Sequence, residues 1–437
     1  MLAIQLLSLW LASASLTGAS LAQAPLFLSA DSFCLVRQPL TCAVHKSLEP
    51  PVVCSFPGPH SVYLPKKVET PAPSKESGLS PPPPSKWENT GKCVDKYCVY
   101  RNLGFANRRG IVAVTTQKHI NRIQALEKKA SSSQKENFHQ NSAWFNLSEV
   151  SGKGLGLVTN TSLSRGNILM ALPPALIIHQ RCFEQTPHAS LLPLLEAAVA
   201  SMPVELEGLF MGQMSHFPGP KIPSILATNI FQMDLGGYGG DGGHYGNFPE
   251  ISRFNHDCRP NVIFHIDPVR LVAVTTIVRE VIPGEELSIS YVDPKDPKTK
   301  RQERIKEAWG FECSCSLCTA PPKEEEKSRK RVEGIKELER TLEDLGAAKG
   351  KVNKKMMERL VKRYREERLE GYMSGGLTLV AMNFNMLGDA KNAEKYAKMA
   401  EEAVVMERGR GAADAEAMRN LGRDPRGHFT WRARVGR

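Results

Sequence analysis

Three cysteines within six residues, Cys313, Cys315 and Cys318, form the pattern with the clearest chemistry in this chain. A Cys-x-Cys-x-x-Cys cluster supplies three thiolates, one short of the four ligands of a tetrahedral structural zinc site. Cys258 is the candidate for the fourth ligand, although a lone cysteine in the segment 255–261 would otherwise be interpreted as a buried free thiol. A zinc ion held by all four would join two distant pieces of the chain, an arrangement in which active sites are often built.

A glycine-rich segment at 151–156, Ser-Gly-Lys-Gly-Leu-Gly, suggests a backbone that approaches a ligand closely. The spacing is not that of a dinucleotide-binding turn, which would need glycine where Leu157 stands, and the segment opens into a strand-like run. It also lacks the Gly-Lys-Ser/Thr ending of a phosphate-binding loop. Taken alone, it predicts a tight hairpin turn.

Length and charge bound the class of protein. A chain of 437 residues predicts two or three domains with ample apolar residue for their cores. The net charge of +11 is modest for this length, so we expect no direct nucleic-acid binding. The basic stretches 327–331 and 419–437 are interpreted as solvated faces, although the first is dense enough for a nuclear address. No stretch reaches the ~18 apolar residues of a membrane span.

The N-terminal residues carry a second compartment signal. Residues 1–24 contain an apolar run followed by Ala22-Gln23-Ala24, which matches a signal-peptide cleavage site and predicts the secretory pathway. The run lacks the usual preceding Lys or Arg, so the nucleus or cytoplasm is the alternative. In an oxidising compartment, the five upstream cysteines could form two disulfides and leave one thiol, with the pairing open. These five are Cys34, Cys42, Cys54, Cys93 and Cys98.

Composition divides the rest of the chain. Residues 25–140 form a Cys/Pro-rich extension, with strands expected around 93–115 and a helix at 117–129. Residues 144–291 contain short strand-like runs, a helical stretch at 187–217 and a glycine-rich loop at 236–246.

Beyond residue 320 the pattern becomes helical. Apolar residues recur at helical spacing, and the hairpin at 377–405, with Ala393, Tyr396, Ala397 and Ala400, resembles one tetratricopeptide unit. Such a unit could bind a peptide partner. The basic tail 409–437 is expected to be poorly ordered.

The order and spacing of the motifs together resemble a SET-domain protein lysine methyltransferase of the split-SET type. The resemblance implies an α+β fold, in which a β-rich SET domain of small sheets with a pseudoknot and inserted helices precedes an all-α, tetratricopeptide-like region. It implies a SET domain at 141–295, a post-SET zinc segment at 296–320 and the helical region at 321–437. The matching segments are 152–156, 165–166, 253–261, 284–291 and 309–318.

The resemblance also implies roles for individual residues. The cofactor would be S-adenosylmethionine, Tyr291 would lie at the methyl-transfer channel, Phe311 would form part of the lysine channel, and the zinc would be structural. In this family serine usually follows the Asn-His pair, but this chain has Asp257, which could tune cofactor binding or weaken activity. The implied cofactor-binding residues are Lys153, Gly154, Leu155, Gly156, Asn255, His256 and Tyr291, and the implied zinc ligands are Cys258, Cys313, Cys315 and Cys318.

Two functions of different classes follow. The first is an active methyltransferase, in which a neutral lysine amine of a protein substrate, histone or not, displaces the methyl group in line. The second is a catalytically silent, zinc-stabilised SET-like adaptor. The joint presence of Tyr291, Asn255, His256 and the glycine hairpin favours the enzyme. A third and weaker hypothesis is a secreted, disulfide-bonded protein in which the SET region has been reused.

Overall fold

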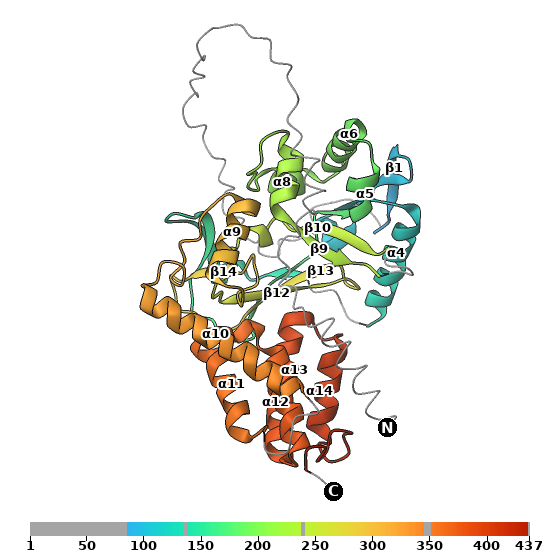
Figure 1. Cartoon of the computed structure of the whole chain (residues 1–437). Helices are drawn as coiled ribbons and strands as arrows, with labels where there is room; N and C mark the ends of the chain where they lie inside the picture. The colour runs from blue at the N-terminus through green and yellow to red at the C-terminus, as the bar shows by residue number, and fades with distance from the viewer. Residues whose placement is uncertain (1–84, 134–137, 237–240, 345–350, 436–437) are drawn as a thin grey trace, which may run out of the picture.

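The computed structural model describes residues 85–133, 138–236, 241–344 and 351–435, and Figure 1 shows their arrangement. The signal-like segment, Cys34, Cys42 and Cys54 lie outside these residues. The strands are β1 (Glu88–Val94), β2 (Tyr97–Asn102), β3 (Ile111–Thr115), β4 (His139–Gln140), β5 (Phe145–Val150), β6 (Gly154–Thr159), β7 (Ile168–Leu172), β8 (Leu176–His179), β9 (Ile230–Asp234), β10 (Gly243–Asn247), β11 (Asn255–His256), β12 (Val262–Asp267), β13 (Val272–Ile277) and β14 (Glu286–Ile289). The helices are α3 (Phe105–Arg108), α4 (Gln117–Ser133), α5 (Gln180–Gln185), α6 (His188–Val199), α7 (Val204–Met211), α8 (Lys221–Asn229), α9 (Lys298–Trp309), α10 (Pro322–Glu343), α11 (Lys354–Glu366), α12 (Ser374–Met386), α13 (Ala390–Arg408) and α14 (Ala413–Arg423).

The largest sheet combines the N-terminal extension with later segments. Its order is β1-β2-β3-β8-β10-β9, and β3 pairs in parallel with β8 through Val112 and Leu176. The strands and helix expected within 93–129 are therefore present. The extension contributes three of the six strands of this sheet, β1, β2 and β3. Strand β3 is buried at all five positions and lies inside the sheet between β2 and β8.

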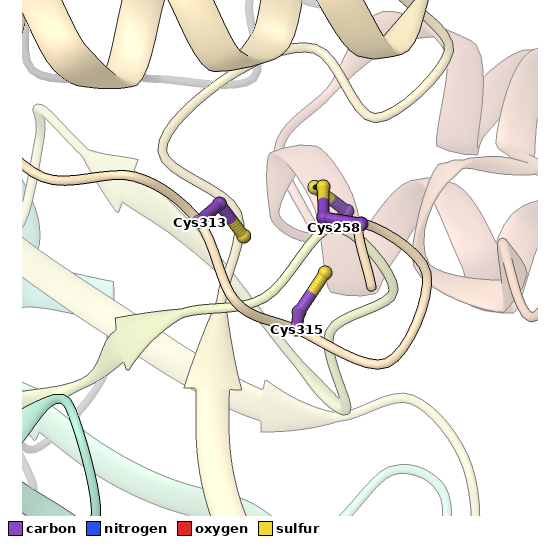
Figure 2. A group of neighbouring side chains, drawn as sticks. Cys258, Cys313 and Cys315 are labelled. Carbon is purple, nitrogen blue, oxygen red and sulfur yellow. Dashed lines mark hydrogen bonds between the residues drawn. The ribbon is translucent and has the colours of Figure 1, made fainter. Parts of the chain in front are cut away.

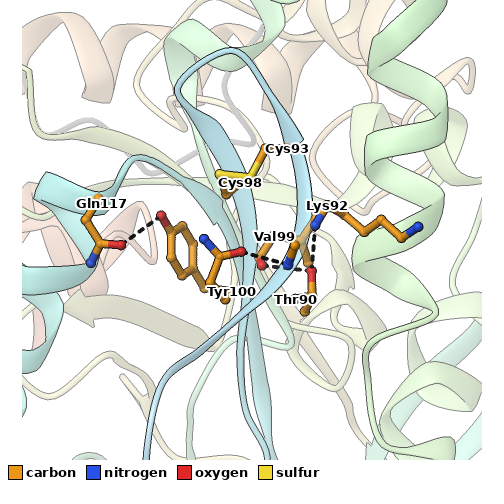
Figure 3. The surroundings of a disulfide bond; sticks show 9 residues. Thr90, Lys92, Cys93, Cys98, Val99, Tyr100 and Gln117 are labelled. Atoms are coloured by element: carbon orange, nitrogen blue, oxygen red, sulfur yellow. Dashed lines mark hydrogen bonds between the residues drawn. A yellow bond between two sulfur atoms is a disulfide. The ribbon is translucent and has the colours of Figure 1, made fainter.

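A disulfide closes the hairpin of β1 and β2 by joining Cys93 to Cys98 (Figure 3). Beside it, the Thr90 hydroxyl donates to the Val99 carbonyl over 3.0 Å. The Tyr100 hydroxyl reaches Gln117 at the start of α4, which ties the hairpin to that helix. The sequence left the disulfide pairing of the upstream cysteines open, and the structure pairs Cys93 with Cys98, five residues away.

Two four-stranded sheets form the second part of the fold, in the orders β11-β14-β6-β5 and β12-β13-β7-β4. Strand β11 pairs in parallel with β14, so Asn255 lies opposite Ser288 and His256 opposite Ile289. Segment 255–258 therefore lies beside 286–291, as the pseudoknot of the resemblance requires. Strand β6 then pairs with β14 on its other edge, which brings the glycine hairpin to the same place.

Two local predictions differ from the structure. The expected helix at 187–217 is two helices, α6 and α7, because Pro203 precedes α7 and begins it. Part of the expected loop at 236–246 forms strand β10, with His244 and Tyr245 buried in the large sheet. A side chain at Gly246 would come within 2.7 Å of Phe248, so close packing rather than loop flexibility explains this glycine.

The helical region gathers α10 to α14 at one end of the molecule (Figure 1). Its core is formed by the apolar faces of these helices, including Leu338, Leu360 and Val380. The tail beyond Gly409 was predicted to be poorly ordered, and that prediction is wrong for 413–423, which form α14. Its buried residues Ala415 and Met418 are only weakly apolar in sequence, so their helical spacing was easily overlooked.

A buried ion pair joins the helical region to the sheets. The Arg259 guanidinium contacts the Glu367 carboxylate, with Nε 3.1 Å from Oε1, and both side chains are almost fully buried. Arg259 also donates to the carbonyl oxygens of Cys258 and Pro294. Arg331 of α10 contacts the same carboxylate. The segment that carries the predicted cofactor residues is therefore anchored to the helices.

Among the residues that the structure describes, no helix combines the length and apolar character needed to cross a bilayer.

Candidate active site and metal centre

A cavity of 770 Å³ lies between the glycine hairpin, segment 251–256 and the end of α9. Six of the residues predicted to bind the cofactor or the substrate lie in its wall, whereas Gly154 and Gly156 lie beside it in β6. The cavity is large enough for a nucleoside-sized ligand, which typical pockets of ~300–1,000 Å³ accommodate. The six are Lys153, Leu155, Asn255, His256, Tyr291 and Phe311.

Glu286 orders the polar side of this cavity. Its carboxylate accepts hydrogen bonds from Lys153 Nζ at 2.6 Å and from Asn255 Nδ2 at 3.0 Å. Burial, the largest single effect, lowers the pKa of Lys153, but the hydrogen bond and charge of Glu286, together with the charges of Asp257 and Cys313, outweigh burial and leave the pKa above its ordinary value. Lys153 thus remains a cation at the mouth of the hairpin.

Glycine at position 156 is required by close packing. A Cβ there would lie 2.5 Å from Asn255 Nδ2 and 3.2 Å from Glu286 Oε1. The absence of a side chain lets β6 lie against Asn255, which positions that amide beside the cavity. Gly154 instead has a positive φ of 72°, which side chains rarely adopt.

His256 connects the cavity with the cysteines. Its Nδ1 accepts a hydrogen bond from the backbone N–H of Tyr291 at 3.0 Å, so the proton of the neutral ring lies on Nε2. Nε2 is 3.4 Å from the Cys258 sulfur. Burial lowers the pKa of His256 to about 3, so the ring is neutral at physiological pH. It is therefore placed to donate to a thiolate.

The Tyr291 hydroxyl is held in place by the backbone. It donates to the Phe254 carbonyl oxygen at 2.7 Å, and burial raises its pKa well above the ordinary value. Tyr291 is therefore a neutral phenol at physiological pH, and its proton is engaged by the Phe254 carbonyl oxygen.

Aromatic rings line the region next to this hydroxyl. The Trp309 ring centre lies 4.9 Å from that of Tyr291, and Trp309 donates from Nε1 to the Thr228 carbonyl oxygen. Gly310 ends α9 with a φ of 71°, and a Cβ there would lie 1.8 Å from the His216 ring. The chain thus turns sharply before Phe311, whose side chain is partly exposed at the cavity.

The four predicted zinc ligands come together in one buried group, hereafter the cysteine cluster. One sulfur from each lies within 4.8 Å of the others, and Figure 2 shows the sulfur atoms of three of them pointing toward one another. A zinc ion with Zn–S bonds of about 2.3 Å would hold tetrahedral sulfurs roughly 3.8 Å apart, and Cys258 and Cys318 are 3.6 Å apart. The donor set and spacing fit structural zinc. The members of the cluster are Cys258, Cys313, Cys315 and Cys318.

A buried arginine compensates the charge of this cluster. Arg301 of α9 donates from Nε to the Cys258 sulfur at 3.1 Å and lies 3.9 Å from the Cys318 sulfur. Mutual hydrogen bonds among the four thiols lower the pKa of Cys315 and Cys318 and raise the pKa of Cys258 and Cys313. Thiolates are the form that binds metal, and His256 and Arg301 are suitable outer donors to them.

The unusual Asp257 has a local role. Its Oδ1 accepts the backbone N–H of Arg259 at 2.7 Å, and its side chain is not part of the cavity wall. Burial raises the pKa of this carboxyl group. It shapes the turn that leads into Cys258.

Four further functional candidates were not recognised from the sequence. Gln213, in the cavity wall, keeps Oε1 buried without a protein hydrogen-bond partner while Nε2 donates to Ser252. Glu286 and Trp309 lie within motifs that were recognised in the sequence, so their place in those motifs could have identified them. Gln213 and Arg301 lie outside those motifs and gave no such signal. The four are Gln213, Glu286, Arg301 and Trp309.

Comparison with known proteins decides the family. Residues 154–292 match the SET domain. Over 288 residues the chain is 30% identical to histone-lysine N-methyltransferase set5 of Schizosaccharomyces pombe, with 64% of this chain and 83% of that protein covered. This chain belongs to the SET-domain family of lysine methyltransferases. The SET match runs from β6 through β14 and therefore contains Asn255, Glu286 and Tyr291 of the cavity.

Other similarities are narrower. N-lysine methyltransferase SMYD2 of Gallus gallus is 37% identical to this chain over 84 residues. That match covers 19% of this chain and 19% of the relative's length. A crystal structure of the SET domain of LSMT bound to lysine and AdoHcy aligns at 11% identity and a TM-score of 0.29. That alignment covers 70% of this chain and 92% of the other.

Proposed function

We propose that this chain transfers the methyl group of S-adenosylmethionine to a lysine amine of a protein substrate. The observation that carries the proposal is the convergence of Asn255, His256 and Tyr291 on one cavity, beside the glycine hairpin. These residues come from segments 35 residues apart and are joined by the Tyr291 N–H to His256 hydrogen bond. The family membership supplies the reaction class.

The cavity wall suits such a cofactor. Gln213 Oε1 is a buried acceptor that lacks a protein donor, so a ligand N–H or O–H would satisfy it. The glycine hairpin keeps side chains away from the cavity mouth: a Cβ at Gly152 or Gly154 would meet no atom within 4 Å. The bound cofactor would supply an electrophilic methyl group on a sulfonium.

The chain's own residues would prepare the lysine amine. Free lysine has a pKa of about 10.4 and arrives protonated. The half-buried ring of Tyr291 and the buried ring of Trp309 leave little room for water around an ammonium, so entry favours the neutral amine. The Tyr291 proton is already donated to Phe254, which leaves its oxygen as an acceptor that orients the amine. Rate acceleration would come from alignment and electrostatics.

We also propose that the cysteine cluster holds a structural zinc ion. Cys313 is both a member of the cluster and part of the cavity wall, so a metal there would fix the wall. Its ligands join the turn after β11 to the segment after α9. The zinc would take no part in the transfer itself.

The test is a pair of measurements on the full-length chain. We would titrate S-adenosylmethionine calorimetrically and then measure transfer of a labelled methyl group to a panel of purified histone and non-histone proteins, locating methyl-lysine by mass spectrometry. Tyr291→Phe is expected to bind the cofactor and lose most transfer. Tyr100→Phe, which removes a buried hydroxyl bonded to Gln117 away from the cavity, is the matched control.

The outcomes separate the two functions. Cofactor binding with lysine methylation that depends on Tyr291 supports the enzyme. Cofactor binding without transfer to any protein in the panel would indicate the silent adaptor. An absence of cofactor binding by a chain that retains its zinc would contradict the proposed use of the cavity.

A further inference from the structure

Three buried histidines meet at a point that belongs neither to the cavity wall nor to the cysteine cluster. They are hereafter the histidine cluster: His119 in the first turn of α4, His179 at the end of β8 and His244 in β10. Each side chain is at most 3% exposed. One ring nitrogen from each lies within 4.8 Å of those of the other two. Neither the family match nor the proposed methyl transfer requires these residues.

The rings have the mutual geometry of metal ligands. Their centres form a nearly equilateral triangle with sides of 4.7, 5.0 and 4.7 Å, and the ring planes cross at 65° to 70°. A zinc ion with Zn–N bonds of about 2.0–2.1 Å at tetrahedral angles would hold three imidazole centres roughly 5 Å apart. Rings that merely packed against one another would not need to present nitrogens to a common point.

Outer hydrogen bonds orient two of the rings. His244 Nδ1 lies 2.8 Å from the Gly242 carbonyl oxygen, which only accepts, so Nδ1 carries the proton and Nε2 keeps its lone pair. His119 Nδ1 lies 2.8 Å from the Thr116 hydroxyl, which can accept in the same way. Metal-binding histidines usually donate their other N–H to such groups. The Thr115 hydroxyl lies 2.9 Å from His244 Nε2 and can donate to its lone pair, so metal binding would require this hydroxyl to turn away.

A carboxylate completes the set. Asp241 Oδ2 lies 3.8 Å from His119 Nε2, and its Oδ1 lies 3.5 Å from His179 Nε2. The Asp241 side chain is 28% exposed, which gives an ion a path from solvent. Three imidazoles and one carboxylate make the four-coordinate donor set that zinc accepts.

His179 differs from the other two histidines. Its Nδ1 accepts the backbone N–H of Arg181 at 3.1 Å, which places the proton of the uncharged ring on Nε2, facing Asp241. Metal binding would move that proton and break this helix cap. The free energy of structural zinc binding far exceeds that of one such hydrogen bond.

The protonation state of the cluster is the one that metal binding needs. Burial lowers the pKa of His119, that of His179 to about 4 and that of His244 to about 3. The rings are therefore uncharged at neutral pH, and neutral imidazole is the ligand form.

We propose that the histidine cluster and Asp241 bind a structural zinc ion. The ion ties α4, which belongs to the N-terminal extension, to β8 and β10 of the SET region. It would therefore fasten α4 onto the sheet beside the place where β3 of the extension pairs with β8 and His179 lies opposite His244.

The test is metal analysis of the full-length chain, stripped with chelator and titrated with zinc or cobalt. Cobalt bound by thiolates shows an intense charge-transfer absorption, whereas cobalt bound by nitrogen and oxygen ligands does not, so the two clusters are distinguishable. We expect two zinc ions per chain in the wild type. Asp241→Asn is expected to weaken the non-thiolate site by about tenfold or more, as even outer-ligand changes do. His119→Gln should abolish it.

His265→Gln is the matched control, because His265 is a partly buried histidine whose Nδ1 contacts Met406 and which lies outside both clusters. It should leave both metals in place. Binding of one zinc per chain, with all cobalt absorption of the thiolate type, would overturn the proposal. So would a second metal that persists in His119→Gln and Asp241→Asn. Because Asp241 is partly exposed, its variant keeps the test decisive if His119→Gln fails to fold.

Discussion

The cysteine cluster and the histidine cluster are both buried groups of metal-ligating side chains, yet they are assembled in opposite ways. Three of the four cysteines lie within six residues, and a single distant residue, Cys258, completes the set. The histidines lie about 60 residues apart, and each comes from a different element of the large sheet and its flanking helix. Local spacing therefore indicated one candidate metal site, whereas the other candidate became visible only in the folded structure.

The two clusters also differ in what surrounds them. Cys313 is part of the cavity wall, and His256 contacts both Cys258 and the Tyr291 backbone. The histidine cluster lies among β3, β8 and β10, away from the cavity. We therefore expect damage to the cysteine cluster to affect both stability and catalysis, and damage to the histidine cluster to affect stability alone.

The largest effect is expected for Cys313→Ser. Losing a thiolate ligand should release the metal of the cysteine cluster and lower the free energy of unfolding by about 3–5 kcal/mol. Methyl transfer should fall with it, because the cavity wall loses its anchor. Zinc content, thermal unfolding and transfer rate would be measured together. Unchanged transfer after loss of this zinc would remove the difference drawn between the clusters.

A pH effect is expected next, in the chain stripped of metal. The folded pKa values of His179 and His244, about 4 and 3, lie below the unfolded value of about 6.5. Between those values the unfolded chain binds more protons, so stability is present above pH 6.5 and is lost as the pH falls. We expect a loss on the order of 1 kcal/mol per pH unit for each ring. The charged groups facing the cluster are Asp241, Lys118, Arg122 and Arg181.

Chemical unfolding at pH 7, 6 and 5 would measure this slope. His179→Gln should flatten it, whereas His265→Gln should reduce it less. A slope that is the same in His179→Gln and in the wild type would show that the histidine cluster does not control acid stability.

Tyr291→Phe is expected to change the free energy of unfolding less than the substitutions above and to affect mainly the reaction in the cavity. The hydroxyl loses its hydrogen bond to Phe254, and transfer should fall roughly 10- to 100-fold, equivalent to about 1.4–2.7 kcal/mol in activation free energy. Both metals should remain. Steady-state kinetics and zinc analysis of the same preparation would check this, and a loss of the metal of the cysteine cluster would mean that Tyr291 acts through that cluster.

Asp257→Ser should have the smallest effect. A serine hydroxyl can accept the Arg259 N–H in place of the carboxylate, and the side chain is outside the cavity wall. We expect stability to change by no more than about 0.5 kcal/mol and cofactor affinity to stay within roughly twofold. Calorimetric titration would test this. A large gain in affinity would show that the carboxylate acts on the cofactor through the turn.

Several features of this protein were accessible from the sequence because their signals are local. The spacing of three cysteines alone predicts a metal site at Cys313, Cys315 and Cys318, and the order of the motifs indicates the SET fold. The helices beyond residue 320 follow from apolar periodicity, except α14, whose buried alanine and methionine residues give a weak signal. Six of the residues predicted to bind the cofactor or the substrate lie in the wall of the cavity.

Other features depend on which distant segments become neighbours. Glu286 is an ordinary strand residue until β14 pairs with β6 and brings it to Lys153 and Asn255. His119 and His244 are far apart in the sequence and become neighbours only when β3, β8 and β10 form one sheet. A lone histidine or glutamate is common in any chain, so its type carries little information, and only the tertiary structure decides which of them meet in a buried, water-poor place where their chemistry changes.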